Sequence, residues 1–297
     1  MAPTYRVLAD RQRAQLWIGG PGRSTPELLT EFADVLIEAP NWSLDGRALF
    51  LNGHGRLWRL DLHRPEAGLR PVEFEHLPAI NNDHVLDPDG AHIYLSANDG
   101  HIYRGALGGG PVDRVTPGDG AWHFLHGVAP DGRRLAYVQL DDLTRPGRLA
   151  LLAPHGGPVL VDTGPGHLDG PEWSPAGDWI YFNTESFSER RGHAQLARIR
   201  DPAGAIPAGA MERLVASDTV DWFPHLSPDS QWASYLSFPA GTEGHPADLD
   251  VVVTVVAMSD WTAPVQTYPL FGGQGTLNVN SWSPDSSSFA FVAYPVT

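Results

Sequence analysis

The sequence predicts an all-β protein: a six-bladed β-propeller whose ring is closed by N- and C-terminal strands that share the last blade. Three observations carry this prediction: a phrase that recurs six times, alternation of apolar and polar residues around it, and an incomplete copy at each end. A chain of 297 residues is long enough for one large all-β core. We therefore expect a single domain over residues 1–297, without a linker.

The recurring phrase consists of a short apolar stretch, a turn of the Pro-Asp-Gly type and a second apolar stretch. Proline presets the backbone at the first central turn position, and Asp-Gly tolerates the left-handed geometry behind it. The flanking stretches alternate with period two and are rich in β-branched and aromatic residues, as half-buried strands are. The positions aligned with the turn proline lie 44, 42, 45, 53 and 56 residues apart: Leu44, Pro88, Pro130, Pro175, Pro228 and Pro284.

Two further strand-like pieces follow each hairpin, for example residues 101–107 and 111–116 in the second copy. Four strands in about 40–45 residues match one propeller blade. Tryptophan stands two residues before the turn proline position in three copies (Trp42, Trp173 and Trp282), where it is expected to pack between neighbouring blades.

The two ends of the chain complete each other. The last copy stops after two strands, and about forty residues precede the first copy. We expect residues 289–293 to pair with residues 14–19, because closure of the ring removes free sheet edges that invite aggregation.

Composition excludes several classes of function. The net charge of −15 argues against nucleic-acid and membrane partners. All 20 basic residues are arginine, so no lysine can form a Schiff base. The absence of cysteine excludes disulfides, thiolate nucleophiles and cysteine-ligated zinc. The chain has no apolar run near 18 residues and does not begin like a secretory signal, so we expect a cytoplasmic protein.

Two copies, WSPAGDWIYFN from Trp173 and WSPDSSSFAFV from Trp282, resemble the PD40 (WD40-like) repeats of the TolB-like propellers. The resemblance covers nearly the whole chain and implies a six-bladed ring. Propellers with similar repeats include oligogalacturonate lyases, which use a histidine-lined metal site on the top face. They also include the non-catalytic domains of prolyl oligopeptidases, but this chain has no G-x-S-x-G nucleophile motif.

A site is expected where the first strand of each blade enters the central channel. His84, His126 and Asn280 share one repeat position, four residues before the turn proline. Glu172 and His225 stand three residues before it, so a regular strand would point them to the other side. A β-bulge would bring all five side chains together.

A divalent metal (Mn, Zn or Ca) is one possible occupant, and no organic cofactor is implied. Neutral imidazole and carboxylate groups suit such ions. The predicted ligands are His84, His126, His225 and, from the polar loop of the fifth copy, His245. The alternative is that these histidines only form hydrogen bonds in a wet channel.

Two functions remain open. The first is a metal-assisted lyase or hydrolase acting on a carbohydrate or sugar acid, with His126, Arg190 and Arg191 as catalytic residues. In that case the arginines clamp a carboxylate; otherwise they are solvated loop residues. The second is a TolB-like binding or scaffold module for a sugar, peptide or protein.

The expected partner is a small-molecule or oligosaccharide ligand, and in a binding module aromatic rings such as Trp122, Trp222 and Phe187 would stack on a sugar. No oligomeric state is predicted. The predicted ligand-binding residues are Asn82, Trp122, Asp169, Glu172, Trp222, Asn278 and Asn280.

Overall fold

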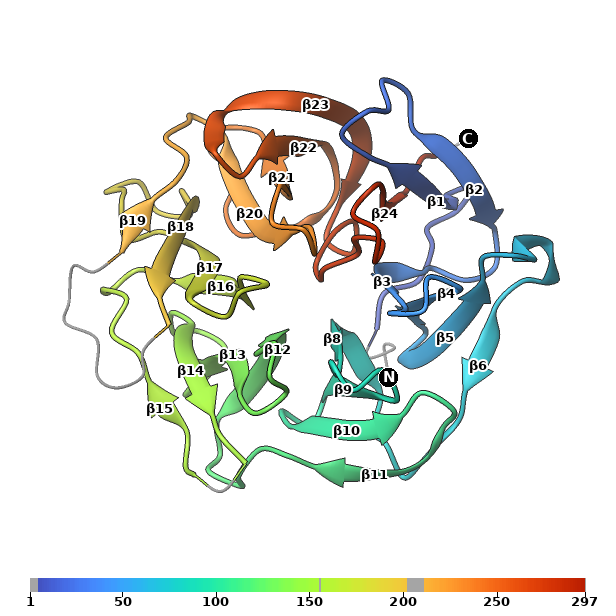
Figure 1. Cartoon of the computed structure of the whole chain (residues 1–297), viewed down its shortest axis with the longest axis horizontal. Helices are drawn as coiled ribbons and strands as arrows, with labels where there is room; N and C mark the ends of the chain where they lie inside the picture. Colours follow the sequence, from blue (N-terminus) through green and yellow to red (C-terminus); the bar gives the residue numbers. More distant parts are fainter. Residues whose placement is uncertain (1–4, 155, 202–210, 297) are drawn as a thin grey trace.

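A computed structural model describes residues 5–154, 156–201 and 211–296, and its strands form six sheets arranged in a ring (Figure 1). Within these residues there is no α-helix, only a single 3-10 turn at Pro65–Ala67. No helix in the described part of the chain could cross a membrane. The six-bladed β-propeller predicted from the repeat is confirmed.

Five blades each contain four antiparallel strands, which run from the inside of the ring outwards in chain order. The first contains β3 (Glu38–Trp42), β4 (Ala48–Gly53), β5 (Arg56–Asp61) and β6 (Arg70–Val72). The second contains β8 (Ile80–Leu86), β9 (His92–Ala97), β10 (Ile102–Ala106) and β11 (Gly110–Arg114), with the short β7 (Phe74–Glu75) parallel to β11.

The third blade contains β12 (Trp122–Val128), β13 (Leu135–Leu140), β14 (Arg148–Leu152) and β15 (Val159–Leu160). The fourth contains β16 (Leu168–Trp173), β17 (Trp179–Thr184), β18 (Gln195–Arg200) and β19 (Glu212–Arg213). The fifth contains β20 (Val220–Leu226), β21 (Trp232–Phe238), β22 (Ala247–Ala257) and β23 (Asp260–Gly273). The wide spacing after Pro228 comes from the long β22 and β23 as well as from the loop before β22.

The sixth blade closes the ring as expected. Its C-terminal strand β24 (Phe289–Ala293) pairs antiparallel with β1 (Ala14–Gly19), and β2 (Glu27–Phe32) pairs with the other side of β1. The segment 276–282 takes the place of the innermost strand and contacts β24 through an isolated bridge between Trp282 and Phe289 and through backbone hydrogen bonds from Ala290 and Val292. One backbone group next to this segment bonds to the first blade instead: the carbonyl of Gly275 accepts a hydrogen bond from the Ala39 amide.

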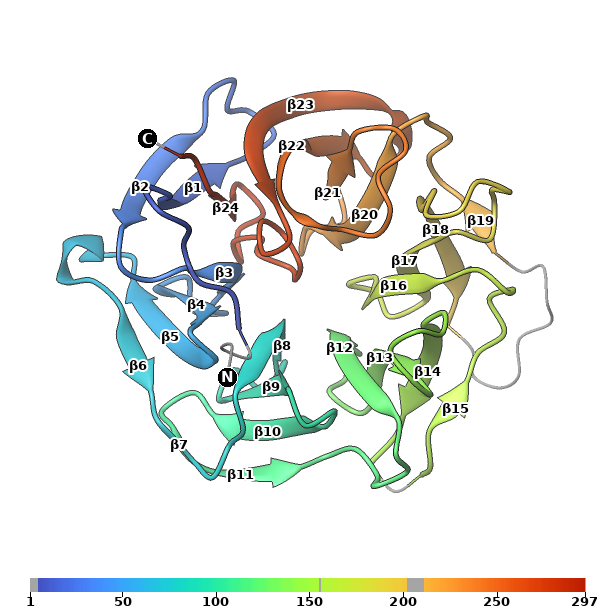
Figure 2. The same cartoon turned by 180° about the vertical axis from the view of Figure 1, so that it is seen from behind.

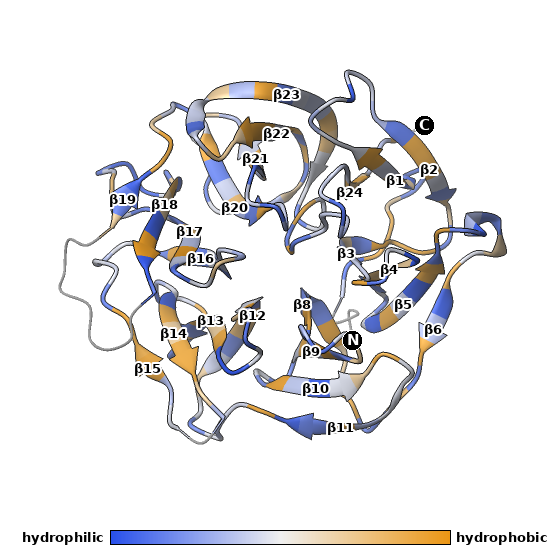
Figure 3. Ribbon diagram, viewed as in Figure 1, coloured by the Kyte–Doolittle hydropathy of each residue, from blue (hydrophilic) through white to orange (hydrophobic). Residues whose placement is uncertain are grey.

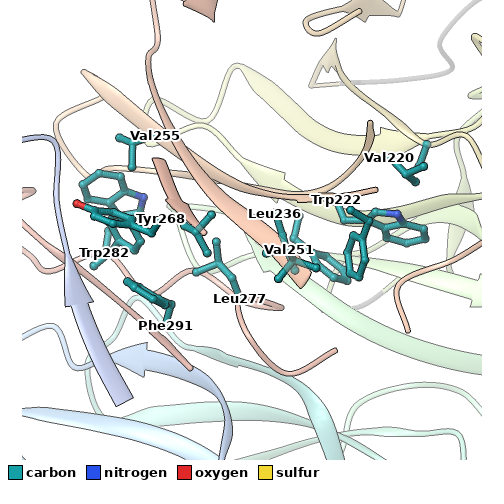
Figure 4. Packing of buried hydrophobic residues seen from close by; sticks show 14 residues of the cluster. Val220, Trp222, Leu236, Val251, Val255, Tyr268, Leu277, Trp282 and Phe291 are labelled. Atoms are coloured by element: carbon teal, nitrogen blue, oxygen red, sulfur yellow. The ribbon is translucent and has the colours of Figure 1, made fainter. Parts of the chain in front are cut away.

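The core lies between the blades. Apolar and polar residues alternate along many strands (Figure 3), so each sheet packs its apolar side chains against its neighbours. Trp173 and Trp282 are each 4% exposed, as predicted. Trp282 packs with Tyr268 and Phe291 across the fifth and sixth blades (Figure 4), while Trp42 is only partly buried.

The innermost strands carry the β-bulge on which convergence of the site depends. Their pairing shifts register at the same repeat position in β3, β16 and β20. The residues there have φ of 50°, 61° and 57° and each precedes a proline: Ala39, Gly170 and Phe223. The extra residue shifts by one position the alternation of side chains between the two faces of the strand. The side chains that follow are thereby turned toward the channel: Asn41, Glu172 and His225.

Candidate functional site

A cavity of about 420 Å³ opens where the innermost strands of the second to fourth blades begin. Its wall includes Asn82, Trp122, Asp169 and, from the loop between β21 and β22, His245. A wider hollow of about 900 Å³ adjoins it and shares His245 with it. We refer to the smaller cavity as the channel mouth. It lies on the face that carries the loops between second and third strands, as predicted.

Asp169 is the centre of the polar groups at the channel mouth. Its Oδ1 lies 2.9 Å from Nε2 of His126, and its Oδ2 lies 3.5 Å from Nε2 of His245 and 3.9 Å from Nε2 of His167. Burial opposes ionisation of this carboxyl, but the three histidines outweigh it and hold the pKa of Asp169 well below its usual value. The carboxylate is therefore a fixed negative charge at neutral pH.

His126 is buried, does not line the cavity, and lies between two carboxylates. Its Nδ1 is 3.3 Å from the carbonyl oxygen of Asn278, and its Nε2 is 3.7 Å from Oδ1 of Asp83 in addition to Asp169. Burial alone would lower the pKa of this imidazole, but Asp83 and Asp169 raise it to about 9. Both ring nitrogens consequently donate protons to protein oxygens. Burial raises the pKa of Asp83 to about 6, in spite of the neighbouring His126.

The other predicted channel residues form a second, separately bonded layer. Nδ1 of His84 lies 2.9 Å from Oδ1 of Asn41, and the Asn41 amide donates to the carbonyl of Asn280. Glu172 accepts from the Asn280 amide at 2.6 Å and faces Nδ1 of His225 at 2.7 Å. The bulge thus brings these side chains together. Burial lowers the pKa of His84 to about 3.

The four histidines predicted as metal ligands do not form one cluster. His126 and His245 share Asp169, whereas His84 and His225 bond to Asn41 and Glu172. Within residues 5–154, 156–201 and 211–296, no group of three or more His, Asp or Glu side chains is arranged to hold a metal ion. Metal binding would require the histidines to give up these hydrogen bonds and present a free lone pair to the ion.

The predicted aromatic residues differ in how far their side chains are exposed in the cavity. Trp122 is half-buried in the cavity wall and stacks with Phe124 at 6.3 Å and 7°. Trp222 is only 1% exposed and packs against His245 with ring centroids 4.5 Å apart. It therefore supports a wall of the site. Asn278 is also buried, and its Oδ1 accepts from the Gly275 amide at 2.7 Å.

The two predicted catalytic arginines lie outside the channel mouth. The side chain of Arg191 is 88% exposed at the rim of the wider hollow, 3.9 Å from Glu243. Arg190 lines a different hollow between the fourth and fifth blades. Neither arginine is among the residues that line the channel mouth with Asp169.

Most residues that line the channel mouth were not among the predicted ones, and Asp83, His167 and Gln274 are examples. Asp83 directly precedes His84, and in a regular strand these two side chains would point to opposite sides. His167 precedes β16, where its Nδ1 accepts from the Gly147 amide at 2.8 Å. Only the string of polar residues at each strand entry could have indicated them.

Comparisons with known proteins agree with this architecture. No family model matches the chain. The uncharacterized protein Atu1656 of Agrobacterium fabrum is 36% identical over 268 residues, which are 87% of this chain and 85% of that protein.

Two solved structures are also similar. One, from Agrobacterium tumefaciens and named provisionally as a TolB, has a TM-score of 0.82 and 33% identity, covering 96% of this chain and 99% of its own. TolB from Acinetobacter baumannii has a TM-score of 0.62 and 15% identity, covering 90% of this chain and 66% of its own, and shows the fold alone. The chain therefore belongs to the TolB-like family of six-bladed β-propellers, together with Atu1656.

Proposed function

We propose that the protein is a binding module that holds a neutral, hydroxyl-rich ligand such as a sugar at the channel mouth, without catalysing a reaction. One observation carries the proposal: the same cavity combines an aromatic wall with fixed hydrogen-bonding groups. Such pockets, mainly apolar with a few convergent polar groups, are typical of small-molecule sites.

The aromatic wall is made by Trp122 and Phe124. Their rings are stacked 6.3 Å apart and nearly parallel, and both side chains are half-buried. They adjoin Leu140 and Leu143 in the same wall. A rigid aromatic surface of this kind suits the C–H faces of a sugar ring.

The polar groups are preorganised. Asp169 is held by His126 and His245, and Oδ2 of Asp83 accepts from the Asn81 amide at 2.9 Å. Carboxylates accept hydrogen bonds from sugar hydroxyls, and groups already fixed in place lose little freedom on binding. The lining of the channel mouth contains two carboxylates and no arginine, so it favours a neutral sugar over a sugar acid.

A metal-assisted lyase or hydrolase is less well supported. General base catalysis requires an accepting group within reach of the substrate proton. Both nitrogens of His126 donate to protein oxygens, and the Asp169 carboxylate already faces three histidines. This set of contacts suits a rigid binding surface.

Calorimetric titration with a panel of neutral mono- and oligosaccharides tests the proposal. We expect at least one to bind, and Trp122→Ala to weaken it roughly two- to tenfold through lost stacking. Trp179→Ala is the matched control, because Trp179 of β17 stacks with Arg198 of β18 and does not line the channel mouth. Unchanged affinity in the Trp122 variant, or turnover of the sugar, would contradict the proposal.

A further inference from the structure

We infer that the protein has a second ligand site, for a small organic carboxylate, in the hollow between the fourth and fifth blades. The hollow has a volume of about 420 Å³ and shares no lining residue with the channel mouth or with the wider hollow beside it. Two arginines line it, Arg190 and Arg213, together with Ser188, Ser217 and the ring of Phe187. The site is additional to the proposed sugar site.

Arg190 is held in the hollow by a buried histidine. Its Nη2 lies 3.1 Å from Nδ1 of His193, which is 7% exposed. Nε2 of the same ring faces the carbonyl oxygens of Ser217 at 3.0 Å and Thr219 at 3.2 Å. Nδ1 also lies 3.0 Å from Oγ of Ser188, and Nε2 lies 3.2 Å from the side-chain amide of Gln195, so the ring is fixed on both sides. His193 acts as a positioning residue for the guanidinium.

Arg213 is held on the other side by backbone and amide oxygens. Its Nε donates to the carbonyl of Val215 at 3.0 Å, and its Nη2 donates to Oε1 of Gln195 at 2.9 Å. Gln195 is fully buried and fixed by further bonds to Ser217 and Thr219. A guanidinium has five N–H donors, so each arginine retains donors for a ligand.

The charges nearby leave the hollow positive. Asp218 also lines the hollow, 3.5 Å from Arg190, but its side chain is 94% exposed, and such a surface pair is weak. The buried Asp221 is already bonded to the hydroxyls of Ser217, Thr219 and Ser237 at 2.6, 3.0 and 2.7 Å. Neither carboxylate satisfies both arginines.

The geometry favours a carboxylate as the occupant. Planar guanidinium groups match the two oxygens of a carboxylate. Phe187, whose ring lies 5.8 Å from the Arg213 guanidinium carbon, adds an apolar surface for the organic part of the ligand. A phosphate dianion suits the hollow less well than a carboxylate. Its larger negative charge is repelled more strongly by Asp218 and by a chain of net charge −15.

Calorimetric titrations with D-galacturonate, succinate, D-galactose and inorganic phosphate test the inference. We expect a carboxylate probe to bind and its affinity to fall at least about tenfold in Arg190→Ala and Arg213→Ala, since hydrogen bonds to charged groups are lost. Arg190→Lys and Arg213→Lys should also weaken binding, because lysine keeps the charge but loses the fork. Arg64→Ala, which removes an exposed arginine of the first blade, should not.

Trp122→Ala separates this site from the channel mouth. Binding of the carboxylate probe should survive in that variant, whatever happens to binding of neutral sugars. The inference is overturned if neither carboxylate binds, if carboxylate binding depends on Trp122 and not on the arginines, or if phosphate binds there in preference. If Arg213→Ala does not fold, Arg213→Lys and Arg190→Ala provide the same comparison.

Discussion

Nε2 of His126 lies 2.9 Å from Oδ1 of Asp169, and this contact joins β12 to β16 at the channel mouth. His245, from the fifth blade, lies near the second oxygen of the same carboxylate. One buried acidic side chain therefore connects three blades and fixes the floor of the proposed sugar site.

The first prediction concerns the pH dependence of stability. The pKa of His126 is raised from 6.5 to about 9 in the folded protein, so its stabilising effect is complete below about 6.5 and is lost as the pH rises through 9. We expect the free energy of unfolding in urea to fall by on the order of 1–3 kcal/mol between about pH 7 and 9.5.

His126→Gln should remove most of this fall, and His92→Gln, a half-exposed control on the second blade, should not. The pKa of Asp83, about 6, places its titration below this window. An equal fall in the wild type and in His126→Gln would contradict the assignment of the effect to His126.

Ring closure gives the second prediction. Residues 14–19 pair with residues 289–293, and the buried side chains of Leu16 and Val292 share one core cluster. Removal of residues 1–20 exposes the edge of β24 and opens this core, so we expect loss of soluble, cooperative folding. A truncated protein with the circular dichroism melting curve of the full-length chain would show that the closure is dispensable.

The third prediction concerns the repeat tryptophan. Trp282 is 4% exposed, and its Nε1 donates to Oγ of Ser234 at 3.1 Å. Trp282→Ala should lower the free energy of unfolding by about 3–5 kcal/mol, the range for deletion of a large core aromatic. Trp282→Phe should cost less because it keeps most of the packing. A loss below about 1 kcal/mol in the alanine variant would mean that this ring does not support the core.

The fold could be predicted from the sequence because each blade repeats the same local signals. The turn residues, the alternation of apolar residues and the incomplete end copies all indicate the same ring, so each supports the others. The irregular innermost segment of the sixth blade was not predicted. Its apolar residues Leu277 and Val279 suit a strand, but its neighbouring carbonyls and amides bond to β3 and to Asn278.

The site could be predicted only in outline. Polar residues at the strand entries indicated the face on which the cavity lies and included Asp169, but which side chains point into the cavity depends on the β-bulge in each strand. Phe223 shows why: a phenylalanine with φ of 57° is not expected from its residue type. The conformations of the loops could not be predicted either. The sequence does not show that His245 reaches Asp169, or that Arg190 lines a different hollow.

A crystal structure with the tightest-binding neutral sugar from the panel tests the central claim most directly. The account predicts sugar density in the channel mouth, with one ring face on Trp122 and hydroxyls on Asp169 and Asp83. Density only at another surface, such as the hollow lined by Arg190 and Arg213, would contradict the proposed sugar site.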